Sequence, residues 1–525
     1  MKSSLHVPVS GSSESFERSL LILVAFALLA LLIHMLVSTN YGLHRDAYLY
    51  LAEADHLAWG YVSIPPFTPF AIHLWEIIFG HSVFAVRLLP AVIGAVSILV
   101  IGQIVRELGG RAWALGLACL AYLVSPAFLR SNALLQPVAF DSLFWLLGTW
   151  AMVRLLRTGE PKWWLALGII FGIGFLNKYS IVFPAFAFVI ALSLTKQRKL
   201  FASRWLLYGV IAGLLIILPN LLWQYAHRWP VIHHMTELRD TQLVNVRLSD
   251  FLMMQLFMIF PAFPVFLAGL LYVFFDPEMQ RYRVMGWTFI VLMAVIILLS
   301  GKFYYTLGIY PVFFAFGGLA VIRYTMRGLA WVRWALPFLM ILLLLPGLPL
   351  SLPVLTYPAM LRYDRGLTKA GMDDVLRWED GTVHPLPQDY ADMTGWEDLA
   401  GIVDSTWRSL TPQEQQRTAI YAENYGQAGA IHYFGKTQHL PEPISFSDSF
   451  LLWAPDSISA TTLVYVNDEA TDIHELFHDV ILAGKVTQPY AREYGTGVYL
   501  CRKPAHGFAA FYSAKVDSLK AAYTR

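Results

Sequence analysis

Long apolar runs alternate with shorter polar connections over the first two thirds of the chain. They have the length of helices that cross a hydrocarbon core of roughly 30 Å. We predict about 11 membrane-spanning helices, at 19–38, 85–105, 112–128, 139–156, 163–176, 181–195, 205–225, 251–275, 286–300, 305–322 and 332–355. The runs at 163–176 and 181–195 are short and closely spaced, so they form either a tight hairpin or one broken element.

Basic residues give the expected orientation. Lysines and arginines near span ends are retained on the cytoplasmic side, and they are frequent in the connections that share a side with residues 1–18. We therefore expect a cytoplasmic N-terminus at 1–18, a multi-pass domain at 19–356 in the cytoplasmic (inner) membrane, and an extracytoplasmic C-terminal segment. The first run exceeds the core of a signal peptide, and an uncleaved or late-cleaved signal is the alternative.

The chain changes character at about Tyr357, where the composition becomes that of a soluble domain. The stretches 418–422, 462–466 and 497–501 have the β-branched and aromatic content of strands. Residues 426–434, stopped by Gly435, and residues 472–483 are predicted to be helices. The sequence thus predicts a polytopic α-helical membrane protein with an extracytoplasmic, periplasmic α/β domain at 357–525.

Composition agrees with this fold class. Hydrophobic residues make up 57% of the 525 positions and charged residues only 14%, against about a quarter in soluble domains. The formal net charge of +2 gives no indication of a nucleic-acid partner. The two cysteines, Cys119 and Cys501, are expected in different compartments, so we predict no disulfide.

The polar and aromatic insert at 39–85 contains the first candidate for chemistry, Asp46. If the residues around it are helical, Glu53 lies about two turns further along the same face. A carboxylate just outside the bilayer can act as a general base on an acceptor hydroxyl or amine, or as a metal ligand. The alternative is a solvated loop acid paired with Arg45.

A second acid, Asp141, lies at the predicted outer start of the span at 139–156. There it can simply stabilise a helix N-terminus, a contribution of roughly 0.3–1 kcal/mol. Alternatively, it faces the same cavity as Asp46, where it orients an acceptor or shares a divalent cation with Asp46.

Two lysines fall on the predicted outer side, where the orientation rule expects few. Lys178 separates two short spans, and Lys302 precedes Tyr304 and Tyr305. A lipid-phosphate donor needs cations at headgroup depth to hold its phosphate and to stabilise the charge of the leaving group. Anchors that extend to the membrane surface are the alternative.

A cluster of aromatic and basic residues at 223–234 contains His227, His233 and His234. These histidines lack a tight metal-ligand spacing with acids, so an amphipathic segment at the membrane interface is the favoured interpretation. No glycine-rich phosphate loop, nucleophile elbow or zinc-helix motif occurs in the sequence.

Several stretches together, in order along almost the whole chain, resemble a known family. They are Arg45–Asp46, Ala58–Val62 with Pro65–Pro66, Ala139–Trp145, Asn177–Lys178, Pro219–Gln224, Lys302–Tyr305 through Tyr310–Pro311, and Asn424–Ala430. The chain resembles the membrane-embedded GT-C glycosyltransferases of the protein O-mannosyltransferase type, which include the lipid A aminoarabinose transferases. The first-loop pattern is the most specific of these features.

The resemblance implies a mannosyltransferase-like glycosyltransferase of the cell envelope. Such an enzyme moves a hexosyl or pentosyl group from a polyprenyl-phosphate donor to a protein, lipid or glycan acceptor on the outer face of the cytoplasmic membrane. Asp46 falls on the family's first-loop aspartate, the expected base or metal-linked catalytic residue. We assign Asp46 and Asp141 to catalysis or to a divalent metal ion, and expect no other cofactor. The residues assigned to substrate binding are Arg45, Tyr50, Glu53, Lys178, Lys302, Tyr304, Tyr305 and Tyr425.

The chain departs from the family pattern at two positions. Many relatives have an acid directly after the first-loop aspartate, where this chain has Ala47, and often a charged or polar residue before the double proline, where it has Ile64. An inactive relative that serves as an assembly subunit is therefore one alternative function. The other is a transporter or flippase of lipid-linked sugars, although the repeated halves typical of transporters are not visible.

Overall fold

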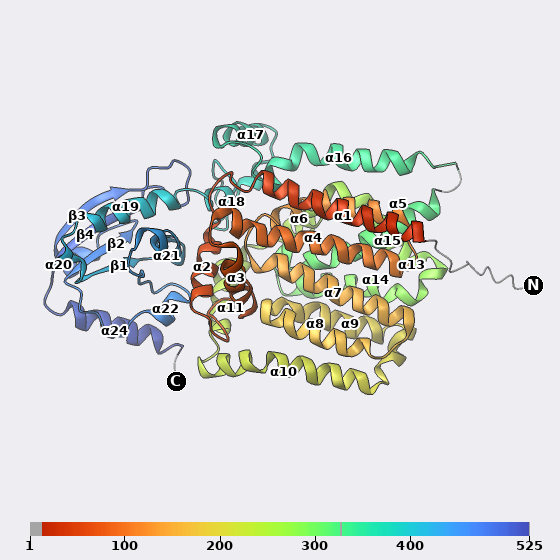
Figure 1. Cartoon of the computed structure of the whole chain (residues 1–525), viewed down its shortest axis with the longest axis horizontal. Coiled ribbons are helices and arrows are strands. Elements are labelled where there is room, and N and C mark those ends of the chain that lie inside the picture. Colours follow the sequence, from red (N-terminus) through yellow and green to blue (C-terminus); the bar gives the residue numbers. More distant parts are fainter. Residues whose placement is uncertain (1–12, 326–327, 524–525) are drawn as a thin grey trace, which may run out of the picture.

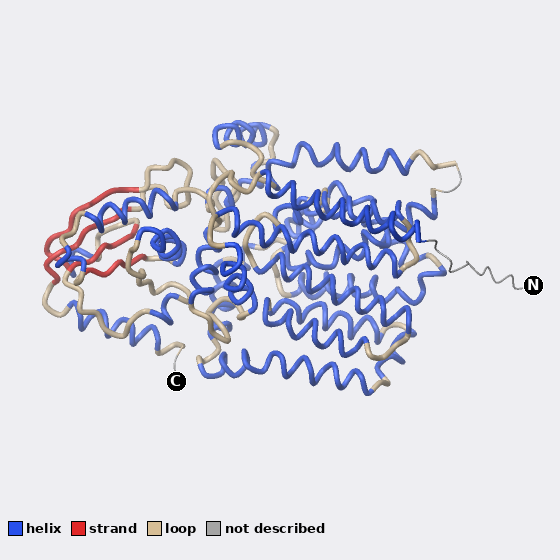
Figure 2. Tube along the Cα trace, in the orientation of Figure 1, coloured by secondary structure: helices blue, strands red, loops and turns tan. Residues whose placement is uncertain are grey.

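The computed structural model describes residues 13–325 and 328–523, so residues 1–12 of the predicted cytoplasmic segment lie outside it. Figure 1 shows a bundle of roughly parallel helices with a mixed α/β region at one end. The helix α1 (Ser13–Leu36) starts at the opposite end of the bundle from the α/β region. Figure 2 shows that the strands are confined to that region.

The apolar runs predicted from the sequence are largely helical, although the runs at 112–128 and 251–275 are each divided between two helices. Among the described residues, seven helices are long and apolar enough to cross a membrane, or eight if one bent pair counts as a span. The helices at 112–128, 163–176 and 181–195 are shorter than that. The bundle helices after α1 are α4 (Val83–Glu107), α5 (Ala112–Leu123), α6 (Pro126–Ser131), α7 (Pro137–Thr158), α8 (Trp163–Asn177), α9 (Val182–Ser193), α10 (Arg204–Ala226), α12 (Leu248–Met258), α13 (Phe263–Phe275), α14 (Arg283–Leu298), α15 (Tyr310–Tyr324) and α16 (Val332–Ser351).

The span predicted at 251–275 is broken. α12 and the segment Phe260–Phe275 meet at an angle of 71°. Pro261 and Pro264 follow the break directly, and proline has no backbone N–H to bond the preceding turn. The prolines therefore account for the bend.

Short helices cover the end of the bundle that faces the α/β region (Figure 1). They are α2 (Arg45–Asp55), α3 (Phe67–Phe79), α11 (Pro230–Thr241), α17 (Tyr357–Lys369) and α18 (Gln388–Ala391). The insert at 39–85 is thus largely helical. Its start is fixed by Arg87 of α4, whose guanidinium donates to the backbone carbonyls of Ser38, Asn40 and Gly42 at 2.9, 2.9 and 2.6 Å.

The α/β region contains one four-stranded sheet in the order β1-β2-β4-β3. Its strands are β1 (Thr418–Ala422), β2 (Thr462–Asn467), β3 (Phe477–Lys485) and β4 (Gly497–Pro504), with only β1 and β2 parallel. Its helices are α19 (Trp396–Arg408), α20 (Pro412–Gln415), α21 (Tyr425–Gln438), α22 (Phe450–Trp453), α23 (Ile473–Leu476) and α24 (Phe508–Lys520). α19 and α21 cover one face of the sheet, and Phe508 of α24 packs on the other.

The three strands predicted in this region are confirmed, but both helix predictions need correction. α21 continues past Gly435 to Gln438 and ends where His439 takes a positive φ of 59°. Residues 472–483 form only the short helix α23 before the chain becomes β3, which pairs with β4. Ile473, Phe477 and Val480 have a spacing that also fits a helix. The hydrogen bonds between β3 and β4 decide in favour of the strand.

Candidate functional site

Asp46 lies in the first turn of α2, at the end of the bundle that meets the α/β region. Its Oδ1 accepts a hydrogen bond from the Tyr425 hydroxyl, and its Oδ2 accepts one from the Gln136 amide, each at 3.0 Å. The side chain is 29% exposed. The Arg45 guanidinium lies 4.2 Å from the centre of the Tyr425 ring, and no ion pair joins these described side chains of Arg45 and Asp46. Asp46 is therefore an anchored carboxylate and not a loop acid paired with Arg45.

A capping box at the start of α21 holds Tyr425 in place. Asn424 Oδ1 accepts hydrogen bonds from the backbone N–H groups of Gly426 and Gln427 at 2.9 and 3.0 Å. The side chain of Gln427 accepts in return from the backbone N–H of Asn424. This reciprocal pattern fixes the first turn of a helix, so the family-like stretch Asn424–Ala430 sets the direction of the Tyr425 hydroxyl.

Gly429 lets α21 lie directly against α2. A Cβ at this position would be 2.8 Å from the backbone carbonyl carbon and the Cβ of Tyr48. That is closer than real Cβ atoms approach such neighbours, so any larger residue would move one helix away from the other. The glycine therefore controls the distance between Tyr425 and Asp46.

Asn177 ties together three segments around Asp46. It accepts a hydrogen bond from Thr68, which follows the double proline, at 2.7 Å. Its amide donates to the carbonyl of Pro137, the residue after Gln136, at 3.0 Å. Asn177 is fully buried, so these bonds hold Gln136 and the adjacent Lys178 in fixed positions.

Two buried amides of α10 brace the loop before the double proline. Asn220 donates to the carbonyl of Trp59 at 2.8 Å and accepts from the Tyr179 hydroxyl at 3.2 Å. Gln224 donates to the same hydroxyl at 3.1 Å. The family-like stretch Pro219–Gln224 therefore connects the insert at 39–85 to the segment that carries Lys178.

Lys178 lies against an aromatic wall. Its ammonium is 5.0 Å from the ring centre of Tyr304 and 5.1 Å from that of Tyr305, within cation–π range. Burial lowers the pKa of this ammonium, the negative charge of Asp141 opposes the shift and the positive charge of Lys302 adds to it. In the described part of the chain the Lys178 ammonium makes no hydrogen bond, so it is available to an anionic ligand.

Lys302 is engaged. Its ammonium donates to Gln242 at 2.5 Å and to Glu379, in the segment after α17, at 2.7 Å. Its distance to the Tyr304 ring centre is 6.0 Å. Lys302 therefore lies at the edge of the aromatic wall as part of an ion pair, whereas Lys178 lies over it.

Asp141 lies beyond the first turn of α7, so stabilisation of the helix N-terminus does not account for it. Its Oδ1 accepts from the Trp145 indole at 3.1 Å and its Oδ2 from the Ser180 hydroxyl at 3.0 Å. The carboxylate is buried, and its negative charge opposes the lowering of the Lys178 pKa. The structure thus holds Asp141, through Ser180, against the short segment that carries Lys178.

Glu53, assigned with Tyr50 to substrate binding, faces the α/β region. It is fully buried; Ser449 lies 2.7 Å from its Oε1, and its Oε2 has no partner. Burial and the charge of Asp448 raise the pKa of Glu53 well above its usual value. Tyr50 lies between the acids, since burial and then the charges of Asp46 and Glu53 raise the pKa of its phenol.

His44, the residue before α2, joins Asp46 to the linker between bundle and sheet. Its Nδ1 is 3.8 Å from Asp46 Oδ2, and its Nε2 is 3.7 Å from Asp389 and 3.6 Å from Asp392. Burial alone would lower the pKa of His44, but these three carboxylates outweigh it and raise the pKa to about 9. His44 Nδ1 also accepts a hydrogen bond from the backbone N–H of Asp46 at 3.2 Å, so the ring caps the start of α2 beside the Asp46 carboxylate.

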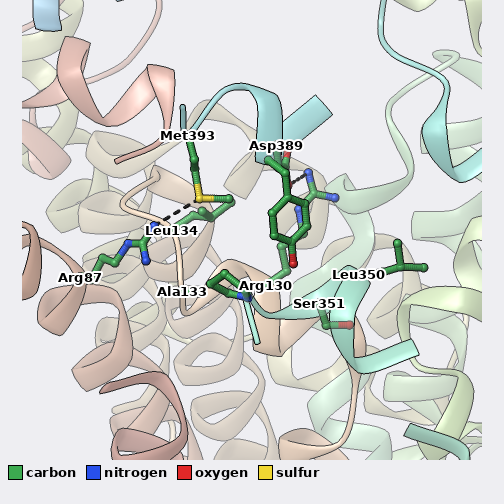
Figure 3. Close-up of a pocket in the computed structure, with 10 residues that line it drawn as sticks. Arg87, Arg130, Ala133, Leu134, Leu350, Ser351, Asp389 and Met393 are labelled. Atoms are coloured by element: carbon green, nitrogen blue, oxygen red, sulfur yellow. Dashed lines mark hydrogen bonds and ion pairs between the residues drawn. The ribbon is translucent and has the colours of Figure 1, made fainter. Parts of the chain in front are cut away.

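A cavity lies beside this histidine network, because Asp389 belongs to both (Figure 3). Its lining residues are Arg87, Arg130, Ala133, Leu134, Leu350, Ser351, Pro353, Asp389, Tyr390 and Met393. Both arginines are already engaged, Arg130 with Asp389 and Arg87 with backbone carbonyls and Met393 Sδ. The cavity therefore offers no uncommitted group for chemistry.

The geometry does not favour a metal ion. The described residues contain no group of three or more His, Cys, Asp or Glu side chains arranged to hold one. Asp46 and Asp141 accept hydrogen bonds from different partners. The divalent cation suggested from the sequence thus has no support in the arrangement, and no step below runs through a metal.

Sequence reasoning missed several residues of this region. Gln136 directly precedes Asp141's helix, and its position before a proline was the available signal. Asp389, Asp392 and Asp448 are joined to the first loop only by the fold, and nothing in the local pattern distinguishes them from surface acids.

Comparison with known proteins gives sequence matches over part of the chain. Residues 63–223 match the family described as dolichyl-phosphate-mannose-protein mannosyltransferase. Lipid A galacturonosyltransferase RgtD of Rhizobium johnstonii is 23% identical over 230 residues, which is 44% of this chain and 48% of that protein. The chain therefore spans about half the length of this relative.

Solved structures match over a larger share of the chain. ArnT from Cupriavidus metallidurans, solved bound to undecaprenyl phosphate, superposes with a TM-score of 0.58 at 16% identity, covering 93% of this chain and 98% of that one. The apo state of the same protein matches equally, at 15% identity. The predicted resemblance to GT-C superfamily membrane glycosyltransferases is thus confirmed. The structural matches show that the chain shares the multi-pass fold of ArnT.

Proposed function

We propose that the chain transfers a sugar from a polyprenyl-phosphate donor to an acceptor on the outer face of the cytoplasmic membrane. In this proposal the N-terminus is cytoplasmic, and the α/β region and the Asp46 site are extracytoplasmic. One observation carries the proposal: Asp46 and Lys178 are tied to the same short segment. Gln136 donates to Asp46, and the next residue, Pro137, accepts from Asn177, the neighbour of Lys178. The Lys178 ammonium lies over the rings of Tyr304 and Tyr305 and makes no hydrogen bond in the described part of the chain.

This arrangement suits a direct displacement at the anomeric carbon. Asp46 takes the proton of the acceptor hydroxyl or amine while the acceptor atom forms the new bond to that carbon. The bond between the anomeric carbon and the phosphate oxygen breaks, and the phosphate leaves with the electron pair. A single displacement inverts the anomeric configuration, and a positioned base contributes about 10²- to 10⁴-fold to such a step.

Each group around Asp46 has a part in this chemistry. Tyr425 and Gln136 donate to the two oxygens, which orients the carboxylate and leaves further lone pairs for the acceptor proton. Lys178 stabilises the charge that develops on the leaving phosphate. The solved ArnT with bound undecaprenyl phosphate supports a polyprenyl-phosphate donor for a chain of this fold.

The test uses a strain that lacks the gene, complemented with the wild type, Asp46→Asn or Glu53→Gln. Mass spectrometry of the lipids and glycans of the cell envelope identifies the sugar that disappears and its acceptor. We expect the wild type and Glu53→Gln to restore the modification and Asp46→Asn to leave it absent at equal protein level. Full modification by Asp46→Asn would contradict the proposal and favour an assembly or transport role.

A further inference from the structure

Asp448 is a carboxylate that the α/β region places against the first outer loop. Its Oδ1 accepts hydrogen bonds from the backbone N–H of Ser449 at 2.7 Å and from the hydroxyl of Ser63 at 3.3 Å, a residue 385 positions away. Ser63 precedes Ile64, where related enzymes often carry a charged or polar side chain. Asp448 is partly exposed, and none of the hydrogen bonds in the described residues uses its Oδ2.

The backbone at Asp448 shows that its position is specified by the fold. Its φ is +50°, in the left-handed region. Few residues other than glycine adopt this region, and asparagine and aspartate do so most readily. The conformation points to a side chain that is held in place for its contacts.

Ser449 lies between Asp448 and Glu53, and it identifies Asp448 as the hydrogen-bond acceptor of the two. Ser449 Oγ accepts from the backbone N–H of Val62 at 3.3 Å and lies 2.7 Å from Glu53 and 3.0 Å from Asp448. A hydroxyl has one proton to donate, so only one of the two acids can receive it. A buried ionised Glu53 with an unpartnered oxygen would be costly. Glu53 therefore carries its own proton, and Ser449 donates to Asp448.

Two tyrosines separate Asp448 from Asp46. Burial and then the charges of Asp46 and Asp448, among other groups, raise the pKa of both Tyr50 and Tyr425. Tyr425 also donates directly to Asp46. Lys178 is connected to Asp46 through a chain of contacts, since Gln136 donates to Asp46 and the next residue, Pro137, accepts from Asn177, the neighbour of Lys178. Asp46 is thus linked to a lysine through Gln136 and shares two tyrosine neighbours with Asp448.

We propose that Asp448 binds the sugar acceptor through its hydroxyl groups. The inference rests on the proposed function, because a displacement needs the acceptor and the leaving phosphate on opposite faces of the anomeric carbon. With the phosphate at Lys178, the acceptor enters from the side of Asp448. A carboxylate with one uncommitted oxygen accepts hydrogen bonds from neighbouring hydroxyls. The acceptor class is therefore a polyol, the sugar of a glycan or of a glycolipid headgroup.

The test measures acceptor and donor dependence separately, with purified full-length chain in lipid nanodiscs. The acceptor probe is the lipid and glycan extract of the strain that lacks the gene, added over a range of dilutions. The donor-side probe is undecaprenyl phosphate, added as a competitor. For Asp448→Asn, we expect half-maximal transfer to need at least about tenfold more extract, since a hydrogen bond to a charged group is lost. The inhibitory concentration of undecaprenyl phosphate should stay unchanged.

Two further variants keep the result interpretable. Asp448→Gly suits the positive φ, so it removes the carboxylate without backbone strain and should show the same rise in acceptor requirement. Asp456→Asn, an acid of the same region paired with Lys520 at 2.7 Å, is the matched control and should behave as the wild type. Thermal unfolding verifies that each variant is folded.

The outcomes separate the two proposals. Unchanged acceptor dependence in both Asp448 variants, with active wild type, would overturn the role of Asp448 alone. An equal loss of donor and acceptor affinity would also overturn it, because that result indicates a general disturbance of the site. Absence of transfer by the wild type would overturn the proposed function and this inference with it.

Discussion

Asp46 and Glu53 lie near opposite ends of α2, on the same face of the helix, and the structure gives them opposite environments. Asp46 is 29% exposed and receives two hydrogen bonds, whereas Glu53 is fully buried and has an unpartnered oxygen. Burial disfavours the charged form of an acid, and donors favour it. Two acids that look equivalent in the sequence thus divide into a carboxylate held by two donors and a buried acid whose pKa is raised well above its usual value.

The amide substitutions of the two acids should separate them most strongly. Asp46→Asn removes the proton acceptor, so we expect kcat for transfer to fall about 10³-fold. Glu53→Gln replaces one neutral donor by another of the same shape, so we expect transfer within about threefold of the wild type. Steady-state transfer with the extracted acceptor fraction measures kcat for both variants. Equal losses of kcat would contradict the different roles of Asp46 and Glu53.

His44 should make the Asp46 end of α2 sensitive to pH. Because its pKa is raised from 6.5 to about 9, the folded chain binds the proton more tightly, a stabilisation of about 3 kcal/mol. This contribution is complete below pH 6.5 and is lost as the pH rises through about 9. We expect the wild type to unfold at a lower temperature at pH 9.5 than at pH 6.5.

The variant His44→Gln should remove this slope. It should be less stable than the wild type at pH 6.5 and approach it near pH 9.5. His506→Gln, at an exposed histidine of the α/β region, is the control and should keep the wild-type slope. A parallel slope in His44→Gln would mean that another group titrates.

Lys178 and Lys302 should contribute unequally to binding of the donor phosphate. Lys178 makes no hydrogen bond in the described part of the chain, whereas Lys302 is bonded to Gln242 and Glu379. We therefore expect Lys178→Ala to weaken undecaprenyl-phosphate binding about 10- to 100-fold, and Lys302→Ala to weaken it less than about fivefold. Titration calorimetry in nanodiscs measures both constants, and the reverse order would move the phosphate to Lys302.

The contact between α2 and α21 should give the smallest effect. Gly429→Ala places a methyl group 2.8 Å from the backbone of Tyr48, and we expect a loss of about 1–3 kcal/mol in the free energy of unfolding. Gly401→Ala is the matched control, because it lies in helix α19 with nothing within 4 Å of an added Cβ. That variant should gain stability by helix propensity. Equal behaviour of the two variants would mean that the helices separate without cost.

Much of the bundle was predictable because membrane crossing imposes long apolar runs, and these runs are largely helical. The broken segment at 251–275 shows the limit, since its prolines indicate a bend but not its direction. Residues 472–483 show another limit: their apolar spacing fits a helix, and only the partner strand β4 makes them a strand. Such pairing is tertiary information that local propensity does not contain.

The candidate site was also predictable only in part. Asp46, Lys178 and Tyr425 were singled out by motif, and the structure brings them to one end of the bundle. Glu53 was assigned to substrate by helical spacing alone, and the fold instead buries it against Ser449. Asp448 could not be found, because its contact with Ser63 crosses 385 positions of sequence and depends on how the α/β region docks.

An experimental structure with undecaprenyl phosphate bound tests the central claim most directly. We expect a phosphate oxygen within about 3 Å of Lys178 Nζ, beside Tyr304, with the position of the anomeric carbon facing Asp46. A phosphate bound instead in the cavity of Arg87 and Arg130, or far from Asp46, would contradict the account.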